Sequence, residues 1–340
     1  MLTPSMIHDA ARRIAPHVLR TPLIDSEPMA ARVGCRVLIK AEHAQHTGSF
    51  KVRGALNAVL SLDAEARGLG IVTASSGNHG LAVATASAVA DVPCRIHLPQ
   101  GASAVKVDAI RRLGAEIVIV DSTDAYQAEV QARAASERGD GVYVSPYNDP
   151  HVIAGQGTVG VDLVADVATH ERPPDAVVVA VGGGGLMSGV GMWLREHWPD
   201  VELVGASPAN DAAMAASIAA GRVVEVEAAP TFSDGTAGGL EPDAITLGLC
   251  DGLVNRWITV DEHAIARACA AMIDDHRAVV EGAAGCALAA AAIHAADKPG
   301  ATIAVVSCGG NVSSAALRRM LVAADAADAA DAADAASPNA

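Results

Sequence analysis

Aromatic residues are scarce in this chain. Phe, Tyr and Trp together make up 2% of the 340 residues, although 51% of the residues are hydrophobic. A substantial core can therefore be buried, but it must consist mainly of Ala, Val, Leu and Ile.

Basic residues are also in short supply. Lys and Arg number 24 against 39 Asp and Glu, which gives a net charge of -15. An acidic surface repels phosphate backbones, so we expect no nucleic acid as a partner.

Long apolar runs and paired cysteines are missing as well. Runs such as AVVVAV at 176–181 have the length of a strand and are too short to cross a bilayer. The first 18 residues lack the apolar centre of a signal peptide. The six cysteines show no C-x-x-C spacing and complete no zinc pattern. We therefore expect a cytoplasmic protein with reduced thiols, no membrane association and no metal site of this type.

Strand-like and helix-like segments alternate along the chain. Apolar strands are predicted at 35–42, 70–75, 94–99, 116–121 and 142–146, and again at 176–181, 202–207, 253–260 and 302–308, with helical segments between them. This rhythm is typical of parallel sheets covered on both faces. It predicts an α/β fold with two doubly wound domains, a smaller one at 45–147 inserted into a larger one formed by 1–44 and 148–322. The Ala/Asp-rich segment 323–340 has Asp at every third position and no apolar stripe, so it is expected to be a frayed or disordered tail.

A lysine stands where a helix is expected to begin. Lys51 follows a turn-and-cap cluster (Thr47, Gly48 and Ser49) and opens a helix predicted to reach about Ala66. The positive end of the helix dipole and partial burial both disfavour an ammonium ion there, so the pKa of Lys51 should fall. A neutral amine is what Schiff-base chemistry requires. The alternative is an ordinary exposed helix lysine.

Four glycines, Gly182 to Gly185, follow a predicted buried strand and open a helix. Their backbone N–H groups could converge on an anion at the helix N-terminus. No Gly-Lys-Ser/Thr follows, and the dinucleotide fingerprint is absent, so a compact phosphate ester fits better than a nucleotide. A simple tight turn is the alternative.

Two further strand ends carry polar groups. The turn SSGNHG at 75–80 could bind a carboxylate through its N–H groups and Asn78, or it could simply cap a helix. Cys308 ends an apolar strand, the end at which ligands collect in α/β sheets. It is either a small buried hydrophobic residue or a neutral partner for a ring nitrogen.

An anion cradle, an activated lysine, a carboxylate turn and a neutral ring-nitrogen partner are together the parts of a pyridoxal phosphate site.

The segments TGSFKVRGA, SSGNHG, IAGQGT, VGGGGLMSG and SCGGNV occur in this order. In this combination the chain resembles the pyridoxal-phosphate fold type II family of threonine/serine dehydratases and serine racemases, over roughly residues 5–320. The resemblance implies two doubly wound domains with the active site in the cleft between them, pyridoxal 5'-phosphate as cofactor, an amino-acid substrate and a homodimer.

The resemblance also implies roles for individual residues. Lys51 would hold the cofactor as a Schiff base and act as catalytic base, and Ser76 would serve the opposite face of the α-carbon. The implied cofactor-binding residues are Phe50, Lys51, Asn78, Gly182, Gly183, Gly184, Gly185, Leu186 and Cys308. The implied substrate-binding residues are Ser75, Gly77, His79 and Gly235, with Ser76 in the same turn. Racemase-type relatives carry an acidic pair for a divalent cation, but Ser207 and Ala213 stand at those places here and Asp211 is out of step.

The expected activity is a β-elimination. It would convert a β-hydroxy amino acid such as L-threonine or L-serine to a 2-keto acid and ammonia. The alternatives are a serine racemase, which Ser76 would permit, and a dehydratase for a bulkier, phenylserine-like substrate, which the small side chains of SDGTAGGLE would admit. A non-catalytic pyridoxal phosphate carrier is the alternative from another class.

Overall fold

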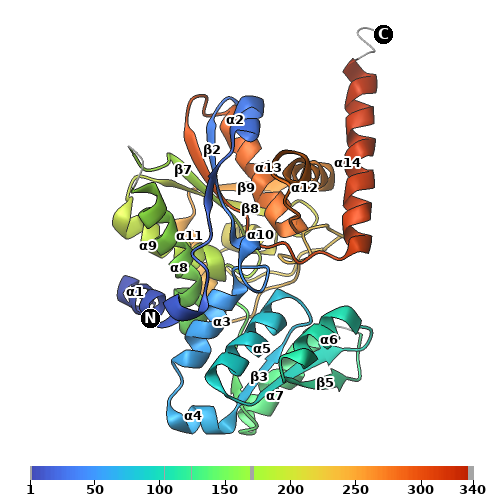
Figure 1. Cartoon of the computed structure of the whole chain (residues 1–340). Coiled ribbons are helices and arrows are strands. Elements are labelled where there is room, and N and C mark those ends of the chain that lie inside the picture. Colours follow the sequence, from blue (N-terminus) through green and yellow to red (C-terminus); the bar gives the residue numbers. More distant parts are fainter. Residues whose placement is uncertain (1, 103, 124, 169–171, 336–340) are drawn as a thin grey trace.

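Two separate sheets organise the chain (Figure 1). The structure is a computed structural model that describes residues 2–102, 104–123, 125–168 and 172–335. The helices that frame the larger sheet include α1 (Pro4–Ile14), α2 (Glu27–Val33), α9 (Gly185–His197), α10 (Ala213–Ala220), α11 (Ile245–Leu253), α12 (Glu262–His276) and α13 (Gly282–Ala296), with short 3-10 turns η1 (Ala15–His17) and η2 (Glu42–Ala44).

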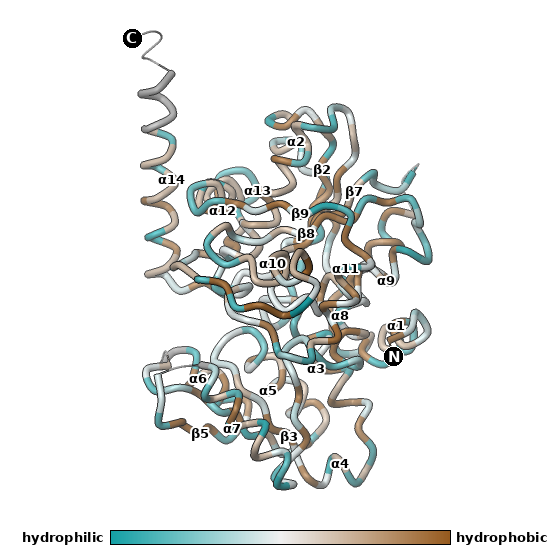
Figure 2. Tube along the Cα trace, turned by 180° about the vertical axis from the view of Figure 1, so that it is seen from behind, coloured by the Kyte–Doolittle hydropathy of each residue, from teal (hydrophilic) through white to brown (hydrophobic). Residues whose placement is uncertain are grey.

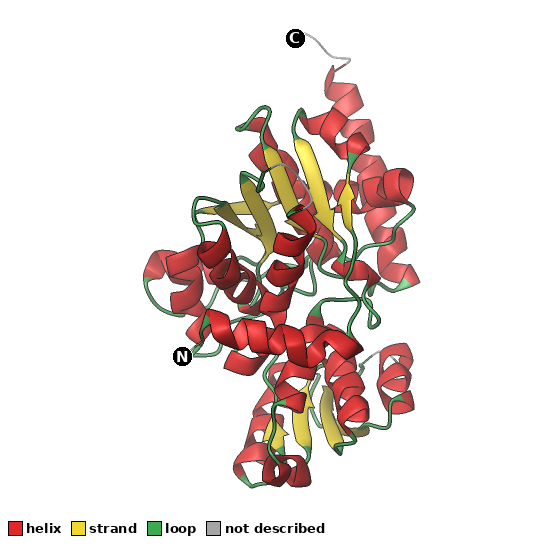
Figure 3. Ribbon diagram, turned by 60° about the vertical axis from the view of Figure 1, so that its left-hand side comes forward, coloured by secondary structure: helices red, strands yellow, loops and turns green. Residues whose placement is uncertain are grey.

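The larger sheet has six strands. Their spatial order is β1 (Leu23–Asp25), β2 (Arg36–Lys40), β10 (Thr302–Val306), β7 (Ala176–Ala180), β8 (Glu202–Pro208) and β9 (Arg256–Val260). Only the edge strand β1 pairs antiparallel, and all the other pairs in the sheet are parallel. Every residue of β7 and β10 is buried, as expected for continuous apolar strands with helices on both sides (Figure 3).

The smaller sheet is entirely parallel. Its order is β5 (Glu116–Val120), β4 (Cys94–Pro99), β3 (Ile71–Ala74) and β6 (Val142–Tyr143). Val72 packs with α7 (Ala125–Glu137), whereas its neighbour Ile71 packs in the cluster that holds α3 (Lys51–Leu60) and α5 (Asn78–Ala90). Because successive strand residues point to opposite faces, helices cover both faces of this sheet too, with α6 (Ala104–Arg112) beside α5. The predicted α/β class with parallel sheets is confirmed, and the exact domain boundaries stay a prediction.

Helix α3 (Lys51–Leu60) lies at the junction of the two sheets. It packs against α5 on one side and α8 (Pro150–Val167) on the other (Figures 1 and 2). The approach to α8 is close, because a Cβ added to Gly155 would lie 2.5 Å from the Arg53 carbonyl oxygen. The helix ends at Leu60 rather than near Ala66, since Asp63 accepts a hydrogen bond from Ala66 N and begins a new helix, α4 (Ala64–Leu69).

The C-terminal segment differs from the expectation of a frayed tail. Helix α14 (Ser314–Ala335) continues into the Ala/Asp repeat and lies at the edge of the body beside α12 in Figures 1 and 2. Ala has the highest intrinsic helix propensity, which the absence of an apolar stripe does not cancel. Met320, Ala324 and Ala327 are buried at helical spacing on the side that meets α12. Residues 336–340 of the predicted tail lie outside the described residues.

All six cysteines are unpaired and buried. Within the described ranges, we find no helix that combines the length and the apolarity needed to cross a membrane.

Candidate active site

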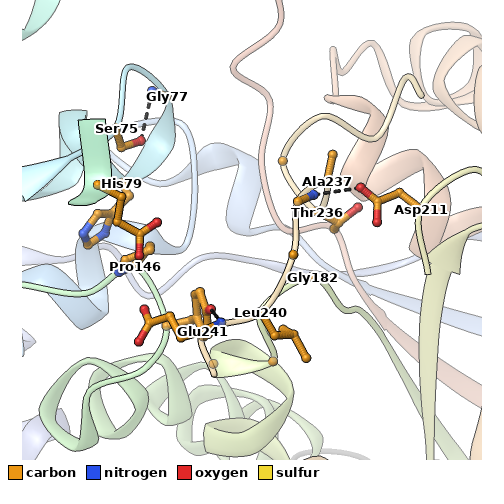
Figure 4. A pocket seen from close by; sticks show the side chains of 18 of the residues that line it. Ser75, Gly77, His79, Pro146, Gly182, Asp211, Thr236, Ala237, Leu240 and Glu241 are labelled. Carbon is orange, nitrogen blue, oxygen red and sulfur yellow. Dashed lines mark hydrogen bonds between the residues drawn. The ribbon is translucent and has the colours of Figure 1, made fainter. Parts of the chain in front are cut away.

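One cavity of about 1310 Å³ is lined by residues from both sheets and from the segments that follow them. Figure 4 shows this cavity with Ser75 and His79 on one side and Thr236 and Asp211 on the other. All the site residues predicted from the sequence line it, namely Phe50, Lys51, Ser75, Ser76, Gly77, Asn78, His79, Gly182, Gly183, Gly184, Gly185, Leu186, Gly235 and Cys308. The structure thus brings these residues together, while the role of each one stays a prediction.

Lys51 is the first residue of α3. The residue before it, Phe50, occupies the N-cap position with helical backbone angles and no side-chain cap, so the predicted cap from the Thr47–Ser49 cluster does not form. The Lys51 ammonium donates to the carbonyl oxygen of Pro146 at 2.9 Å. Burial lowers the pKa of Lys51 to about 8, although the nearby Cys308 and Glu281 act in the opposite direction. About one tenth of the amine is therefore neutral at pH 7, far more than for an ordinary lysine.

This lowered pKa predicts how the cofactor-free protein takes up an aldehyde cofactor. Only the neutral amine attacks a carbonyl, so the attachment rate should rise about tenfold per pH unit and level off above pH 8. The measurement is the change in visible absorbance after mixing cofactor-free protein with pyridoxal 5'-phosphate between pH 6 and pH 10. A rate that keeps rising toward the ordinary lysine value of 10.5 would show that burial does not act on Lys51 in this way.

The glycine run connects β7 to α9 and leaves no room for side chains. Gly184 has φ = +82°, a left-handed conformation that favours glycine. A Cβ at Gly182 would lie 2.6 Å from the Thr236 carbonyl oxygen, and one at Gly183 would lie 2.3 Å from the ring of Tyr147. The first N–H groups of α9 have no partner within the helix, and they carry the positive end of its dipole. This arrangement suits a phosphate group.

Gly183 offers a test of this cradle, because its backbone does not need a left-handed φ. In Gly183→Ala the new methyl group overlaps the Tyr147 ring, and overpacking of this kind costs about 1–3 kcal/mol. We expect cofactor affinity to fall about tenfold or more, measured by titrating cofactor-free protein. Gly183→Ala combined with Tyr147→Ala should recover most of this loss when compared with Tyr147→Ala alone. No recovery in the double variant would mean that the Tyr147 ring is not the source of the loss.

The turn SSGNHG begins α5. Ser75 Oγ accepts a hydrogen bond from Gly77 N at 3.1 Å, and a Cβ at Gly80 would lie only 1.9 Å from the Ser75 carbonyl oxygen. His79 is buried and donates from Nε2 to the Val144 carbonyl oxygen at 2.9 Å. Burial, together with the charge of Lys51, lowers the pKa of His79 to about 3. His79 is therefore neutral and ties the turn to the end of β6. Anion binding by the N–H groups of the turn stays a prediction.

Glu281 is a site residue that the sequence analysis missed. It precedes α13 and is 4% exposed, and both its carboxylate oxygens accept from Asn78 Nδ2 at 2.9 Å. Asn311 joins them, donating from Nδ2 to Asn78 Oδ1 at 2.8 Å. Burial raises the pKa of Glu281 to about 7, although the hydrogen bond from Asn78 opposes the rise. A signal was present in the sequence, since Glu281 is the one charged residue between Arg277 and His294.

Cys308 lies just beyond β10 and is 3% exposed. Burial, reinforced by the negative charge of Glu281, raises the pKa of its thiol well above the ordinary value. The group is therefore a neutral thiol on the cavity wall, the form expected of a partner for an unprotonated ring nitrogen.

The loop that carries Gly235 is fixed at two points. Gly238 N donates to the buried Asp211 carboxylate at 2.8 Å. At the other end, Glu241 accepts from Ser145 Oγ at 3.0 Å and pairs with Arg133 of α7. The loop of the larger sheet is thereby attached to the smaller sheet.

Ser207 and Ala213 stand at the two positions where an acidic pair was expected if the chain bound a divalent cation. Ser207 donates its hydroxyl to the Val181 carbonyl oxygen, and Ala213 begins α10. In the part of the chain that the structure describes, no three His, Cys, Asp or Glu side chains form a group that could hold a metal ion.

Carboxyl groups outnumber cations around the cavity. The acidic residues are Glu129, Asp211, Glu225, Asp234, Glu241, Asp243 and Glu281, and the basic residues are Lys51, Lys106, Arg133 and Arg222. With the anion cradle, the partly neutral amine and the neutral thiol in one cavity, the residues fit pyridoxal 5'-phosphate.

Comparisons with known proteins agree with this chemistry. A sequence profile described as "Pyridoxal-phosphate dependent enzyme" matches residues 14–309. The chain is 36% identical over 323 residues to an L-threonine ammonia-lyase of Thermotoga maritima, covering 94% of this chain and 78% of that protein. It is also 36% identical over 264 residues to a serine racemase of Arabidopsis thaliana, covering 77% of each. The structure of maize serine racemase matches with a TM-score of 0.86 at 32% identity, covering 94% of this chain and 97% of that one.

Proposed function

Since the chain belongs to the pyridoxal-phosphate dependent enzyme family, we propose that it is an ammonia-lyase that converts a β-hydroxy amino acid, such as L-threonine or L-serine, to a 2-keto acid and ammonia. The observation that carries this proposal is the position of Lys51. Its amine, with a pKa lowered to about 8 by burial, lines the same cavity as the glycine cradle and the SSGNHG turn.

The residues would divide the work as follows. Gly182 to Gly185 and the N-terminus of α9 would hold the phosphate, Lys51 would hold the cofactor covalently, and Cys308 would face the ring nitrogen. When bound, the cofactor withdraws electrons from the α-carbon of the amino acid attached to it. The N–H groups of the Ser75–Gly77 turn would bind the substrate carboxylate and so orient the α-proton.

Lys51 would also act as the general base. Released when the substrate amine takes its place on the cofactor, its neutral Nζ would take the α-proton. The β-hydroxyl group would leave with a proton as water, and hydrolysis of the released product would give the 2-keto acid and ammonia. The neutral thiol of Cys308 would leave the ring nitrogen unprotonated and so moderate the electron withdrawal that the cofactor supplies. The hydrogen bonds that join Asn78 to Glu281 and Asn311 would fix the part of the cavity wall that these residues form.

The test is an assay of purified protein with pyridoxal 5'-phosphate for keto acid and ammonia from L-threonine and L-serine. We expect the two products in equal amounts. Cofactor binding without turnover over a panel of β-hydroxy amino acids would instead favour a pyridoxal phosphate carrier.

Racemisation is the second candidate. Ser76 lines the cavity beside Lys51, and serine racemases are among the similar proteins. Both D-serine and pyruvate should therefore be measured from L-serine. Pyruvate forming faster than D-serine supports the lyase, and the reverse order supports the racemase.

We also expect a homodimer in the cytoplasm, by analogy with the family. Light scattering of the purified protein should give twice the mass of the chain.

A further inference from the structure

The outer part of the cavity is bordered by one face of α7. Tyr126 and Val130 are four residues apart on this helix and both line the cavity. Residues at this spacing lie on the same side of a helix. On the other side of the chain, segment 222–228 follows α10 and forms neither helix nor strand. It lines the cavity with Val223, Val224 and Val226.

These apolar side chains are accessible to solvent. Tyr126 is 62% exposed and Val130 is 40% exposed, and the three valines are only partly buried. Exposed apolar groups gathered on a concave surface mark binding sites for apolar ligands. Here they line the same cavity as Lys51.

Small residues keep the inner part of the cavity open. Ala74, Ala180, Ala237 and Ala283 line it together with Gly235. The cavity volume of about 1310 Å³ is shared between the cofactor and the substrate.

The charges around the cavity argue against an acidic substrate side chain. Carboxyl groups outnumber cations among the lining residues. The guanidinium of Arg133 is already paired with Glu129 and Glu241 and lies over the Tyr143 ring at 4.5 Å. At this end Glu129, Glu225 and Glu241 match the cations Arg133 and Arg222, so a substrate carboxylate would find no net positive charge.

Building on the proposed lyase activity, we propose that the preferred substrates are β-hydroxy amino acids with a large apolar or aromatic group on the β-carbon, and that Tyr126 and Val130 determine this specificity. The β-substituent extends outward from Lys51 and lies against these two side chains.

The experiment compares kcat/KM for L-threonine, L-threo-3-phenylserine and L-threo-3-hydroxyaspartate. We expect the aryl substrate to exceed threonine by about tenfold or more, since even one methylene in an apolar pocket changes kcat/KM by about that factor. Hydroxyaspartate should be the poorest of the three. In Tyr126→Ser/Val130→Ser the ratio of phenylserine to threonine should fall about tenfold.

The matched control is Val322→Ser, an exposed apolar residue on α14 outside the cavity, which should leave the ratio unchanged. Threonine turnover with weaker or no phenylserine turnover would overturn the specificity and leave the lyase standing. An unchanged ratio in the double variant would overturn the roles of Tyr126 and Val130. No ammonia from any of the three substrates would overturn the proposed function itself.

Discussion

Lys51→Ala should lower ammonia release by at least about 10³-fold, because it removes both the covalent attachment of the cofactor and the general base. The variant should also lose the visible absorbance that remains with the wild-type protein after free cofactor is removed. Borohydride reduction followed by peptide mapping should label Lys51 in the wild type and no residue in the variant.

The chain offers sharp controls because it has only four lysines, Lys40, Lys51, Lys106 and Lys298. Lys40 is buried in an ion pair with Asp166, and Lys298 is half exposed beside Glu202. Lys298→Ala should therefore keep full activity. Lys106 lines the same cavity as Lys51, so it is the residue that would carry the label if the assignment is wrong.

Local patterns in the sequence were enough to predict the strands from β2 onward and the motifs between them, whereas the short antiparallel edge strand β1 was not predicted. Continuous apolar runs such as 176–180 and 302–306 became fully buried parallel strands, since only a sheet covered on both faces can bury every residue of a run. The glycine run and the SSGNHG turn were recognisable because each lies between an apolar strand and a helix, where free backbone N–H groups can bind an anion.

Features that depend on distant partners could not be predicted in the same way. Asn78 and Glu281 are 203 residues apart, and no local pattern in either segment reports the other. The predicted cap of α3 was wrong for a related reason. Phe50 N bonds to the Cys308 carbonyl oxygen, so the chain before Lys51 is positioned by a strand end from the other end of the sequence rather than by its own hydroxyl groups.

The Asn78–Glu281 contact also bears on the function expected of Asn78. Its amide is turned toward the Glu281 carboxylate, which keeps that buried group hydrogen-bonded. With the pKa of Glu281 raised to about 7 by burial, the network can lose its negative charge near neutral pH. The contribution of Asn78 to cofactor binding should therefore be measured in variants of Asn78 and of Glu281, singly and together.

Arg53 is the second residue whose replacement should have a large effect, on stability rather than on chemistry. It lies two positions after Lys51, is 1% exposed, and pairs with the fully buried Glu42 and with Asp162. Burial alone would lower the pKa of Arg53, but the two carboxylates raise it above the ordinary value. Arg53→Met leaves the Glu42 carboxylate buried without its cation, which should lower the free energy of unfolding by about 3–5 kcal/mol.

Urea unfolding of the cofactor-free protein measures this loss without the added stabilisation of a bound ligand. The matched control is Arg36→Met, which breaks the exposed pair with Asp25 and should cost no more than about 1 kcal/mol. Because η2, α3 and α8 supply Glu42, Arg53 and Asp162, the two ion pairs hold the helix that begins at Lys51 against η2 and α8. Equal urea midpoints for the two variants would mean that packing alone, and not this buried ion pair, fixes the position of Lys51.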